Sequence, residues 1–336
     1  METENVDNGK VLEVKNLKTY FYTSEGVVKA VDGLSYHVGR GECVGLVGES
    51  ACGKSVSAMS VLRLIPYPPG IIVDGEIIFK GEDLLKVSEE EMRDIRGNRI
   101  SMVFQEPTTS LNPVLTVGRQ ISESLELHRR LDKKAARAES VRLLKLVGIP
   151  DAEQRIKDHS FQFSGGMQQR IMIAMALSCN PELIIADEPT TSLDVTVQAQ
   201  ILEIIANLRA EFDMAVMIIT HNLGVVARYV DRVNVMYAGN LVETGPTEEL
   251  YANPKHPYTL GLLSSVPRLD RPANENLRVI KGLPPNLAHL PKGCSFAPRC
   301  DYAMDRCKEE KPELEKVGDR HFRTCFYSVD KLQTAT

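Results

Sequence analysis

Residues 43–65 read CVGLVGESACGKSVSAMSVLRLI, and this stretch decides the fold. Residues 43–47 form a short apolar run typical of a buried strand, and apolar residues recur at helical spacing over residues 55–65. The loop between them fits the pattern G-x-x-x-x-G-K-[ST]. Strand, glycine-rich loop and helix in this order predict a phosphate-binding loop in an α/β protein.

The residue types of this loop suit a nucleotide. Glycines let the loop wrap closely, so that backbone N–H groups and the N-terminus of the next helix face an anion. Lys54 is expected to reach the β- and γ-phosphates, and the Ser55 hydroxyl to take one Mg²⁺ position. The alternative is an ordinary glycine turn with an incidental lysine. We expect nucleotide contacts at Gly48, Glu49, Ser50, Cys52, Gly53, Lys54, Ser55 and Val56.

A second motif, PELIIADEPTTSLD, spans residues 181–194. Its apolar run, residues 183–186, predicts a buried parallel strand that ends in two carboxylates. Beside a phosphate loop, Asp187 is expected to hold Mg²⁺ through water, and Glu188 to act as general base on an attacking water. The alternative is that both are solvated acids at the turn before Pro189.

A third motif, FSGGMQQR at residues 163–170, predicts a second phosphate site. Ser164, Gly165 and Gly166 open a helical segment, so their hydroxyl and amides gather at a helix N-terminus. One chain cannot easily fold this end over its own phosphate loop, so a second ATPase subunit is implied. The alternative is a common Ser-Gly-Gly loop.

With these motifs in place, about the first 250 residues resemble the ATP-binding subunits of ABC transporters. The chain contains GESACGKS, VFQEP, FSGGMQQR, LIIADEP, SLD and MIITHN in that family's order. The resemblance implies that Gln105 contacts Mg²⁺ and the attacking water, that Asp194 crosses a dimer interface, and that His221 contacts the γ-phosphate. The third motif departs from the commonest form at Phe163 and Met167.

The resemblance also implies the domain organisation. We expect an α/β P-loop NTPase core with a β-rich N-terminal subdomain and an inserted helical subdomain at about residues 106–168. The ATP-binding domain is expected at residues 1–253 and a small cysteine-rich C-terminal extension at 254–336. Alignment with the family suggests Phe21 as the aromatic that stacks on adenine, with Tyr20 and Tyr22 as neighbouring candidates.

Composition limits the class of protein. The chain has 336 residues and a formal net charge of −5, and its basic residues are scattered, which argues against a nucleic-acid partner. No apolar run approaches the roughly 18 residues of a membrane span. We therefore expect a cytosolic protein that reaches the cytoplasmic face of the membrane through partner subunits.

The segment YANPKHPYTLGLLSSVPRLD, residues 251–270, resembles the extension of the dipeptide and oligopeptide importer branch. That branch implies a homologous second ATPase subunit, two transmembrane permease subunits and an extracytoplasmic peptide-binding protein. Importers of nickel and other small solutes carry similar extensions and remain an alternative. So do a non-transport ABC ATPase, which usually has two fused domains or a long coiled coil, and an iron–sulfur redox protein.

Four of the seven cysteines lie in the extension, with the spacing C-x5-C-x6-C-x17-C. Clustered thiols in a cytosolic segment indicate metal binding before disulfides, and four suit tetrahedral zinc or an iron–sulfur cluster. The importer resemblance favours a [4Fe–4S] cluster, with zinc or free thiols as alternatives. We expect a structural clip, because no ATP motif includes these thiols. The residues are Cys294, Cys300, Cys307 and Cys325.

Overall fold

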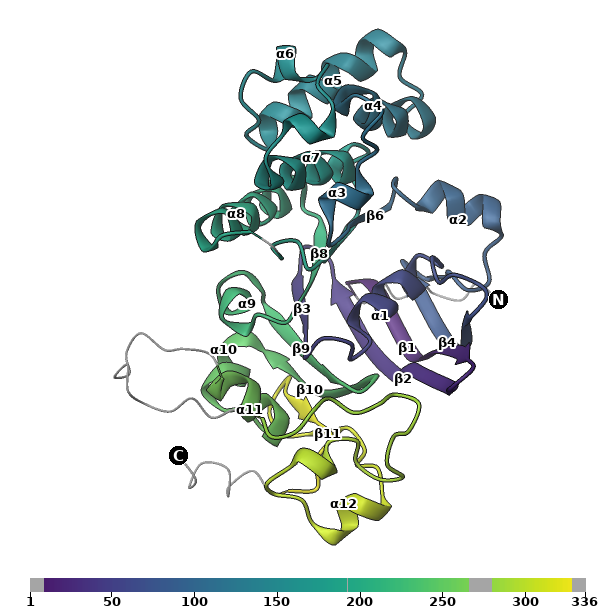
Figure 1. Ribbon diagram of the computed structural model, residues 1–336, viewed down its shortest axis with the longest axis vertical. Helices are drawn as coiled ribbons and strands as arrows, with labels where there is room; N and C mark the ends of the chain where they lie inside the picture. Colours follow the sequence, from purple (N-terminus) through teal and green to yellow (C-terminus); the bar gives the residue numbers. More distant parts are fainter. Residues whose placement is uncertain (1–8, 192, 266–279, 328–336) are drawn as a thin grey trace. The chain divides into compact units, whose positions relative to one another are not determined.

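The protein is described by a computed structural model that covers residues 9–191, 193–265 and 280–327. The chain divides into two compact units, and it passes between them several times. The first unit contains residues 1–11, 38–43 and 79–219, and the second contains residues 12–37, 44–78 and 220–336. The elements of both are labelled in Figure 1.

A parallel sheet forms the centre of the first unit. Its strands lie in the order β8-β7-β6, with Ile185 of β7 aligned with Met102 of β6 and with Met217 of β8. Every residue of β7 is buried, because a parallel strand inside an α/β protein is covered on both faces. The bounds of these strands are β6 Ile100–Val103, β7 Leu183–Asp187 and β8 Ala215–Thr220. The short strand β5, Glu82–Asp83, does not belong to this sheet.

Helices make up the rest of the first unit. Local signals explain where two of them begin: Thr116 caps α4 through the Arg119 N–H, and Asp132 caps α5 through two N–H groups of its first turn. Residues 106–168, predicted as an inserted helical subdomain, contain α3 to α6, the η1 turn and the start of α7. The bounds are α2 Glu89–Ile95, α3 Pro107–Ser110, α4 Val117–His128, α5 Lys133–Leu146, α6 Ala152–Arg155, η1 Ser160–Gln162, α7 Gly165–Leu177 and α8 Val195–Phe212.

The second unit begins with a β-rich part in which the strands lie side by side in the order β2-β1-β4. Helix α1 is joined to these strands by buried hydroxyl pairs: Thr19 with Ser60 at 2.8 Å, and Tyr36 with Ser57 at 3.1 Å. Such pairs satisfy hydroxyl groups that burial removes from water. The bounds are β1 Lys10–Thr23, β2 Gly26–Gly39, β4 Gly70–Phe79 and α1 Lys54–Val61.

A second sheet of this unit joins the phosphate loop's strand to the C-terminal extension. Its strands run in the order β3-β9-β10-β12-β11, with β3 parallel to β9 and the later neighbours antiparallel. The division predicted after residue 253 therefore falls inside one compact unit. The bounds are β3 Cys43–Val47, β9 Arg232–Tyr237, β10 Asn240–Pro246, β11 Glu315–Lys316, β12 Phe322–Arg323, α9 Leu223–Tyr229, α10 Thr247–Ala252, α11 Pro257–Ser264, η2 Ala297–Arg299 and α12 Asp305–Glu309.

The fully buried carboxylate of Glu243 ties the extension to β10. It accepts the N–H groups of Lys255 at 2.6 Å and His256 at 2.9 Å, and it pairs with Nε2 of His321 at 2.7 Å. The other ring nitrogen of His321 pairs with Glu249 at 3.2 Å. One buried side chain thus joins the start of α11 to the segment that leads into β12.

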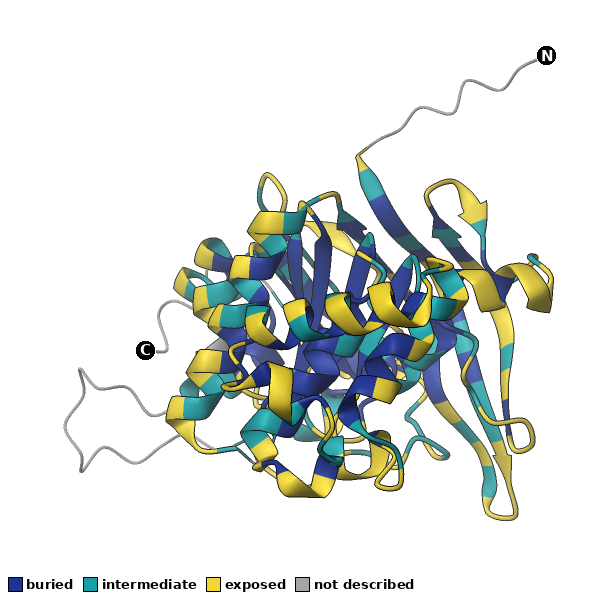
Figure 2. Cartoon of the chain, turned by 90° about the horizontal axis from the view of Figure 1, so that it is seen from above, coloured by how far each residue is buried: buried dark blue, intermediate teal, exposed yellow. Residues whose placement is uncertain are grey.

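The degree of burial differs between the strands and the helices. Figure 2 shows the short central strands buried, the long strands of the β-rich part with both buried and exposed residues, and the helices exposed along one side, as expected for layers that cover a sheet. In the part of the chain that the structure describes, no helix combines the length and the apolar character that a membrane span needs.

We predict that Glu243→Ala lowers the free energy of unfolding by about 3–5 kcal/mol, because it leaves His321 and two backbone N–H groups without their buried acceptor. Denaturant unfolding of the purified chain measures the loss. The matched control is Glu249→Ala, which removes a half-exposed carboxylate from the same histidine and is expected to cost below about 1 kcal/mol. Equal effects of the two variants would contradict the central role of Glu243.

Candidate functional site

The phosphate loop connects β3 to α1, and two of its glycines lie against backbone carbonyls. A Cβ on Gly48 would lie 2.2 Å from the Met236 oxygen, and a Cβ on Gly53 would lie 2.0 Å from the Ala30 oxygen. Gly53 also has φ of 101°, a left-handed conformation that favours glycine. Both positions therefore require glycine for a steric reason that comes from β9 and β2, outside the motif.

Lys54 is buried, and its ammonium group lies under the loop. Nζ donates to the carbonyls of Gly48 and Glu49, each at 2.9 Å. Cys52 lies beside it: burial raises the pKa of the Cys52 thiol, and its carbonyl accepts the Gly239 N–H at 2.9 Å. The loop thus brings a positive charge and a helix N-terminus close together, which is an anion-binding arrangement.

Glu49 is the loop residue that sequence reasoning described least well, because the C-terminal extension holds it. Its N–H donates to the hydroxyl of Tyr258 on α11 at 2.8 Å, and its carboxylate pairs with Arg299 of η2. Tyr258 and Arg299 were not predicted as site residues. Nothing in the sequence signals these contacts, which join positions 209 and 250 residues apart.

The two carboxylates of the second motif lie at the end of β7 in the first unit. Asp187 is buried, and Glu188 has φ of 45°, an uncommon conformation for a residue with a side chain. The Glu188 carboxylate accepts from Gln105 Nε2 at 3.1 Å and from Thr191 Oγ1 at 2.9 Å. The structure thus brings Gln105 and Glu188 together and adds Thr191, a contact that the motif did not indicate. A held carboxylate of this kind can orient and deprotonate a water.

The third motif begins α7, and Ser164 occupies its N-cap position with extended backbone but no side-chain cap. Ser164 and Gly165 are exposed, and a Cβ on Gly166 would lie 2.7 Å from Val197 of α8. Phe163, one of the departures from the common motif, is buried with the Arg155 guanidinium 4.1 Å from its ring centre. The exposed N-terminus of a 13-residue helix can receive an anion from outside this unit.

The remaining motif residues have simple local positions. Asp194 caps α8 by accepting the Val197 N–H at 3.0 Å, so its carboxylate also has a structural role. His221 is exposed and follows β8 directly. Its place at the carboxyl end of a parallel strand is where ligands lie in open α/β sheets.

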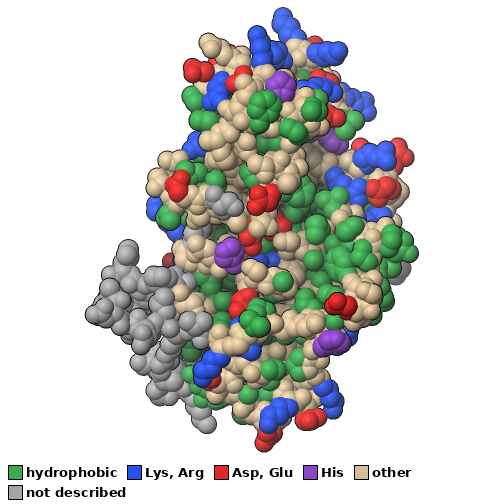
Figure 3. All heavy atoms as spheres, in the orientation of Figure 1, with side chains coloured by type: hydrophobic (Ala, Val, Ile, Leu, Met, Phe, Trp, Pro, Cys, Tyr) green, Lys and Arg blue, Asp and Glu red, His purple; other side chains and the backbone are tan. Residues whose placement is uncertain are grey.

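The three neighbouring aromatics of β1 differ in surroundings. Tyr20 donates to Asp32 at 2.6 Å, Phe21 is half-buried against Gly70, and Tyr22 is 55% exposed. Figure 3 shows hydrophobic side chains gathered over the α1 and β4 part of this unit. The role of Phe21 at adenine stays a prediction. The exposed large hydrophobic residues in this part are Tyr22, Val27, Leu64, Tyr67, Ile71 and Val73.

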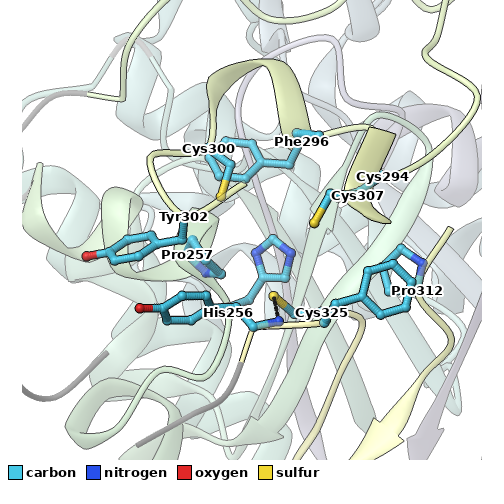
Figure 4. A pocket seen from close by; sticks show the side chains of 12 residues that line it. His256, Pro257, Cys294, Phe296, Cys300, Tyr302, Cys307, Pro312 and Cys325 are labelled. Carbon is cyan, nitrogen blue, oxygen red and sulfur yellow. Dashed lines mark hydrogen bonds between the residues drawn. The ribbon is translucent and has the colours of Figure 1, made fainter. Parts of the chain in front are cut away.

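The four cysteines of the extension line one pocket, together with His256 and several aromatic rings (Figure 4). Cys300 ends the η2 turn, Cys307 lies in α12 and Cys325 follows β12, so three separate segments meet there. The Cys294 N–H donates to the Cys307 carbonyl at 2.8 Å, which fixes two of the segments together. The fold therefore assembles residues that span 32 positions of sequence.

Backbone N–H groups act on three of the four thiols. Those of Tyr302 and of Phe296 and Ala297 lower the pKa of Cys300 and Cys294, and the Tyr327 N–H donates to the Cys325 sulfur at 3.4 Å. Burial nevertheless raises the pKa of the Cys300 thiol to about 12 and that of Cys325 to about 11. Hydrogen bonds to sulfur are what a metal-bound thiolate uses, and a cation would offset the cost of ionising buried thiols.

The positions of the four cysteines can be compared with what a bound metal ion requires. Among the described residues, no three His, Cys, Asp or Glu side chains converge so as to hold one metal ion. A single zinc with ligands at about 2.3 Å would bring its sulfurs within about 3.8 Å of one another. His256 is engaged, because its Nδ1 accepts the Tyr258 N–H at 3.0 Å. Among the described residues, the four cysteines thus share one pocket without forming a metal-ion site, and metal binding by them stays a prediction.

Comparison with known proteins gives two family matches and many relatives. The family described as ABC transporter matches residues 31–191, and the family described as oligopeptide/dipeptide transporter, C-terminal region, matches residues 242–307. The oligopeptide transport ATP-binding protein OppD of Bacillus subtilis is 51% identical over 93% of this chain and 87% of its own length. The dipeptide transport ATP-binding protein DppD of the same organism is 50% identical over 97% of each chain.

A solved structure extends the likeness to the fold. The dimeric post-hydrolysis state of the ATP-binding cassette MJ0796, bound to ADP and Pi, has a TM-score of 0.63 and 25% sequence identity. It covers 70% of this chain and 98% of its own. The nucleotide-binding part of the chain therefore shares the fold of an ATP-binding cassette.

We predict that Gly48→Ala weakens ATP binding about tenfold or more, because the added methyl group would overlap the Met236 carbonyl and displace the loop. Ala51→Gly is the matched control. Ala51 has φ of 61° in the same loop, a conformation that glycine adopts more easily, so this variant should bind as the unchanged chain does. Titration with a fluorescent ATP analogue measures both, and equal affinity of all three chains would contradict the steric argument.

Proposed function

Because the chain belongs to the ATP-binding proteins of oligopeptide and dipeptide ABC transporters, we propose that it hydrolyses ATP to power peptide uptake across the cytoplasmic membrane. The observation that carries this proposal is the sequence identity with OppD, 51%, and with DppD, 50%. Both matches extend over nearly the whole chain, including the C-terminal extension. The local geometry agrees with it. The second unit contains the anion-binding loop with Lys54, and the first unit contains the Glu188 carboxylate, which Gln105 holds by a hydrogen bond.

The proposed roles follow from the chemistry of each side chain. Lys54 and the loop amides bind the β- and γ-phosphates, and the γ-phosphate is also contacted by His221. Glu188 accepts a proton from the attacking water while Gln105 orients that water. Ser55, Gln105 and Asp187 would hold Mg²⁺, which neutralises charge on the phosphates. Phe21 is our candidate for stacking on adenine.

The exposed N-terminus of α7 motivates the proposal of a two-subunit site. In this scheme Ser164, Gly165 and Gly166 cover ATP that is bound to the loop of a second ATPase subunit, and Asp194 lies at the interface. We propose a homologous partner rather than an identical one. Two permease subunits and an extracytoplasmic peptide-binding protein complete the transporter, with this chain at its cytoplasmic face. Closure and opening of the ATPase pair would drive the permeases between two states.

We further propose that Cys294, Cys300, Cys307 and Cys325 hold a [4Fe–4S] cluster. Four thiols around one pocket, with Cys307 buried and the other three partly buried, and an N–H group that donates to the Cys325 sulfur, support this group. A cluster offers a separate iron to each thiolate, so the sulfurs need not converge on one point. It would supply cross-links between η2, α12 and the end of β12.

Glu188→Gln is expected to slow ATP hydrolysis about 10²–10⁴-fold, because the carboxamide cannot accept the proton of water. ATP binding should persist, since the phosphate contacts belong to the loop. The measurement pairs a phosphate-release assay on the assembled transporter with an ATP titration. The comparison variant Lys54→Ala should instead weaken binding itself. Unchanged turnover of Glu188→Gln would refute its role as base.

Anaerobically purified chain is expected to be coloured and to contain about four iron atoms, as a [4Fe–4S] cluster requires. Cys307→Ser should lose that iron. Cys179→Ser is the control, because Cys179 lies in the first unit, outside the pocket, and its loss should leave the iron content unchanged. Colourless protein with about one zinc atom, or with no metal, would contradict the cluster.

A further inference from the structure

Arg299, one residue before Cys300, reaches the phosphate loop from the C-terminal extension. Its Nη1 donates to Oε2 of Glu49 at 2.6 Å, and its Nη2 donates to Oε1 of the same carboxylate at 2.9 Å. The Arg299 side chain is 7% exposed and that of Glu49 is 24% exposed. A two-point pair with so little access to water is held more firmly than a surface ion pair.

The guanidinium is fixed on its other sides as well. Nε donates to the Lys281 carbonyl at 2.9 Å, Nη2 donates to the Gly282 carbonyl at 3.3 Å, and Nη1 reaches the Tyr237 hydroxyl at 3.4 Å. The hydrogen bonds to Glu49 raise the pKa of Arg299, so the group is charged at any relevant pH. Each of these partners holds the cation toward the loop.

Glu49 is also held through its backbone. Its N–H donates to Tyr258, and its carbonyl accepts from Lys54 Nζ at 2.9 Å. The Tyr258 ring packs against Tyr237 and Phe296, with centres 4.6 and 5.3 Å apart. A displacement of Arg299 is thereby transmitted to the residue whose carbonyl positions the phosphate-binding lysine.

Glu49 is the one carboxylate among residues 48–56, and an unneutralised carboxylate beside a polyphosphate repels it. We propose that Arg299 is a positioning residue for ATP binding, which neutralises Glu49 and holds it so that the phosphate loop keeps its binding conformation. This inference rests on the proposed function, namely that the loop binds ATP. This inference makes the segment that contains the four cysteines part of the nucleotide site. The sequence instead predicted that this segment is a structural element separate from the site.

A second contact between the extension and the nucleotide-binding part supports this reading. Lys311 pairs with Asp32 of β2 at 3.3 Å, and Asp32 accepts from Tyr20 of β1. The Lys29 N–H on the same strand donates to the Leu287 carbonyl at 3.2 Å. The extension therefore contacts the β-rich part as well as the phosphate loop, and Arg299 provides its contact with Glu49 of the loop.

The test is a set of full-length variants, Arg299→Gln, Glu49→Gln and the double substitution, titrated with Mg²⁺ and ATP at low and high salt. We expect Arg299→Gln to bind ATP about tenfold more weakly, because Glu49 is left unpaired. The loss should shrink at high salt, which screens the repulsion. The double variant should recover most of the affinity. Lys308→Gln, in an exposed pair of the same segment, is the control and should bind as the unchanged chain does.

Wild-type affinity in Arg299→Gln would overturn the inference. A double variant that binds ATP as weakly as Arg299→Gln would also overturn it, and so would a loss of affinity that does not shrink at high salt. Either result would indicate general unfolding, because unfolding is not reversed by removing the Glu49 charge or by adding salt. The proposed function fails in a different way: the unsubstituted chain would then not bind ATP at all, and the inference would fall with it.

Discussion

The phosphate loop depends on close contact between backbones. Met236 of β9 and Ala30 of β2 place their carbonyl oxygens where Gly48 and Gly53 have no side chain. Since β9 lies between β3 and β10, the same strand that shapes the loop also joins the loop's own strand to the C-terminal extension. The loop's conformation is therefore a property of the whole second unit and not only of its eight-residue motif.

Buried polar groups join the extension to that unit, beside the packed rings of Tyr237, Tyr258 and Phe296. Glu243 collects two N–H groups and a histidine, and Arg299 pairs with Glu49 at two points. Buried charges persist only when they are paired and hydrogen-bonded, so such groups fix geometry strictly. This explains how the described segment 280–327, with its short elements η2, α12, β11 and β12, is held against the nucleotide-binding part.

In the first unit, backbone strain and hydrogen bonds hold the Glu188 carboxylate. Glu188 adopts a left-handed conformation directly after a fully buried strand, and its N–H donates to the Ile219 carbonyl of β8 at 2.9 Å. Gln105 and Thr191 both donate to its carboxylate. A strained residue held from several sides is typical of a functional site, because the surroundings compensate the conformational cost.

The sequence by itself predicted the class of the protein. GESACGKS between a strand and a helix requires glycines and a lysine in one order, and the buried run before Asp187 indicates a parallel strand, so a nucleotide-binding α/β core followed. FSGGMQQR and the order of all the motifs then gave the resemblance to ABC ATPases. These signals are local, since they depend on spacing within a few residues. The importer branch followed from the segment around His256, again by local resemblance.

Only the tertiary structure decided which distant residues complete each site. Arg299 and Tyr258 meet Glu49 across more than 200 residues. Thr191 lies in the same motif as Glu188, but the motif pattern does not indicate the hydrogen bond between them. The spacing of the four cysteines lacks the usual paired knuckles, yet the addition of β12 to β10 carries Cys325 to the pocket. Strand pairing and buried ion pairs depend on the path of the whole chain. A local sequence pattern therefore does not predict them.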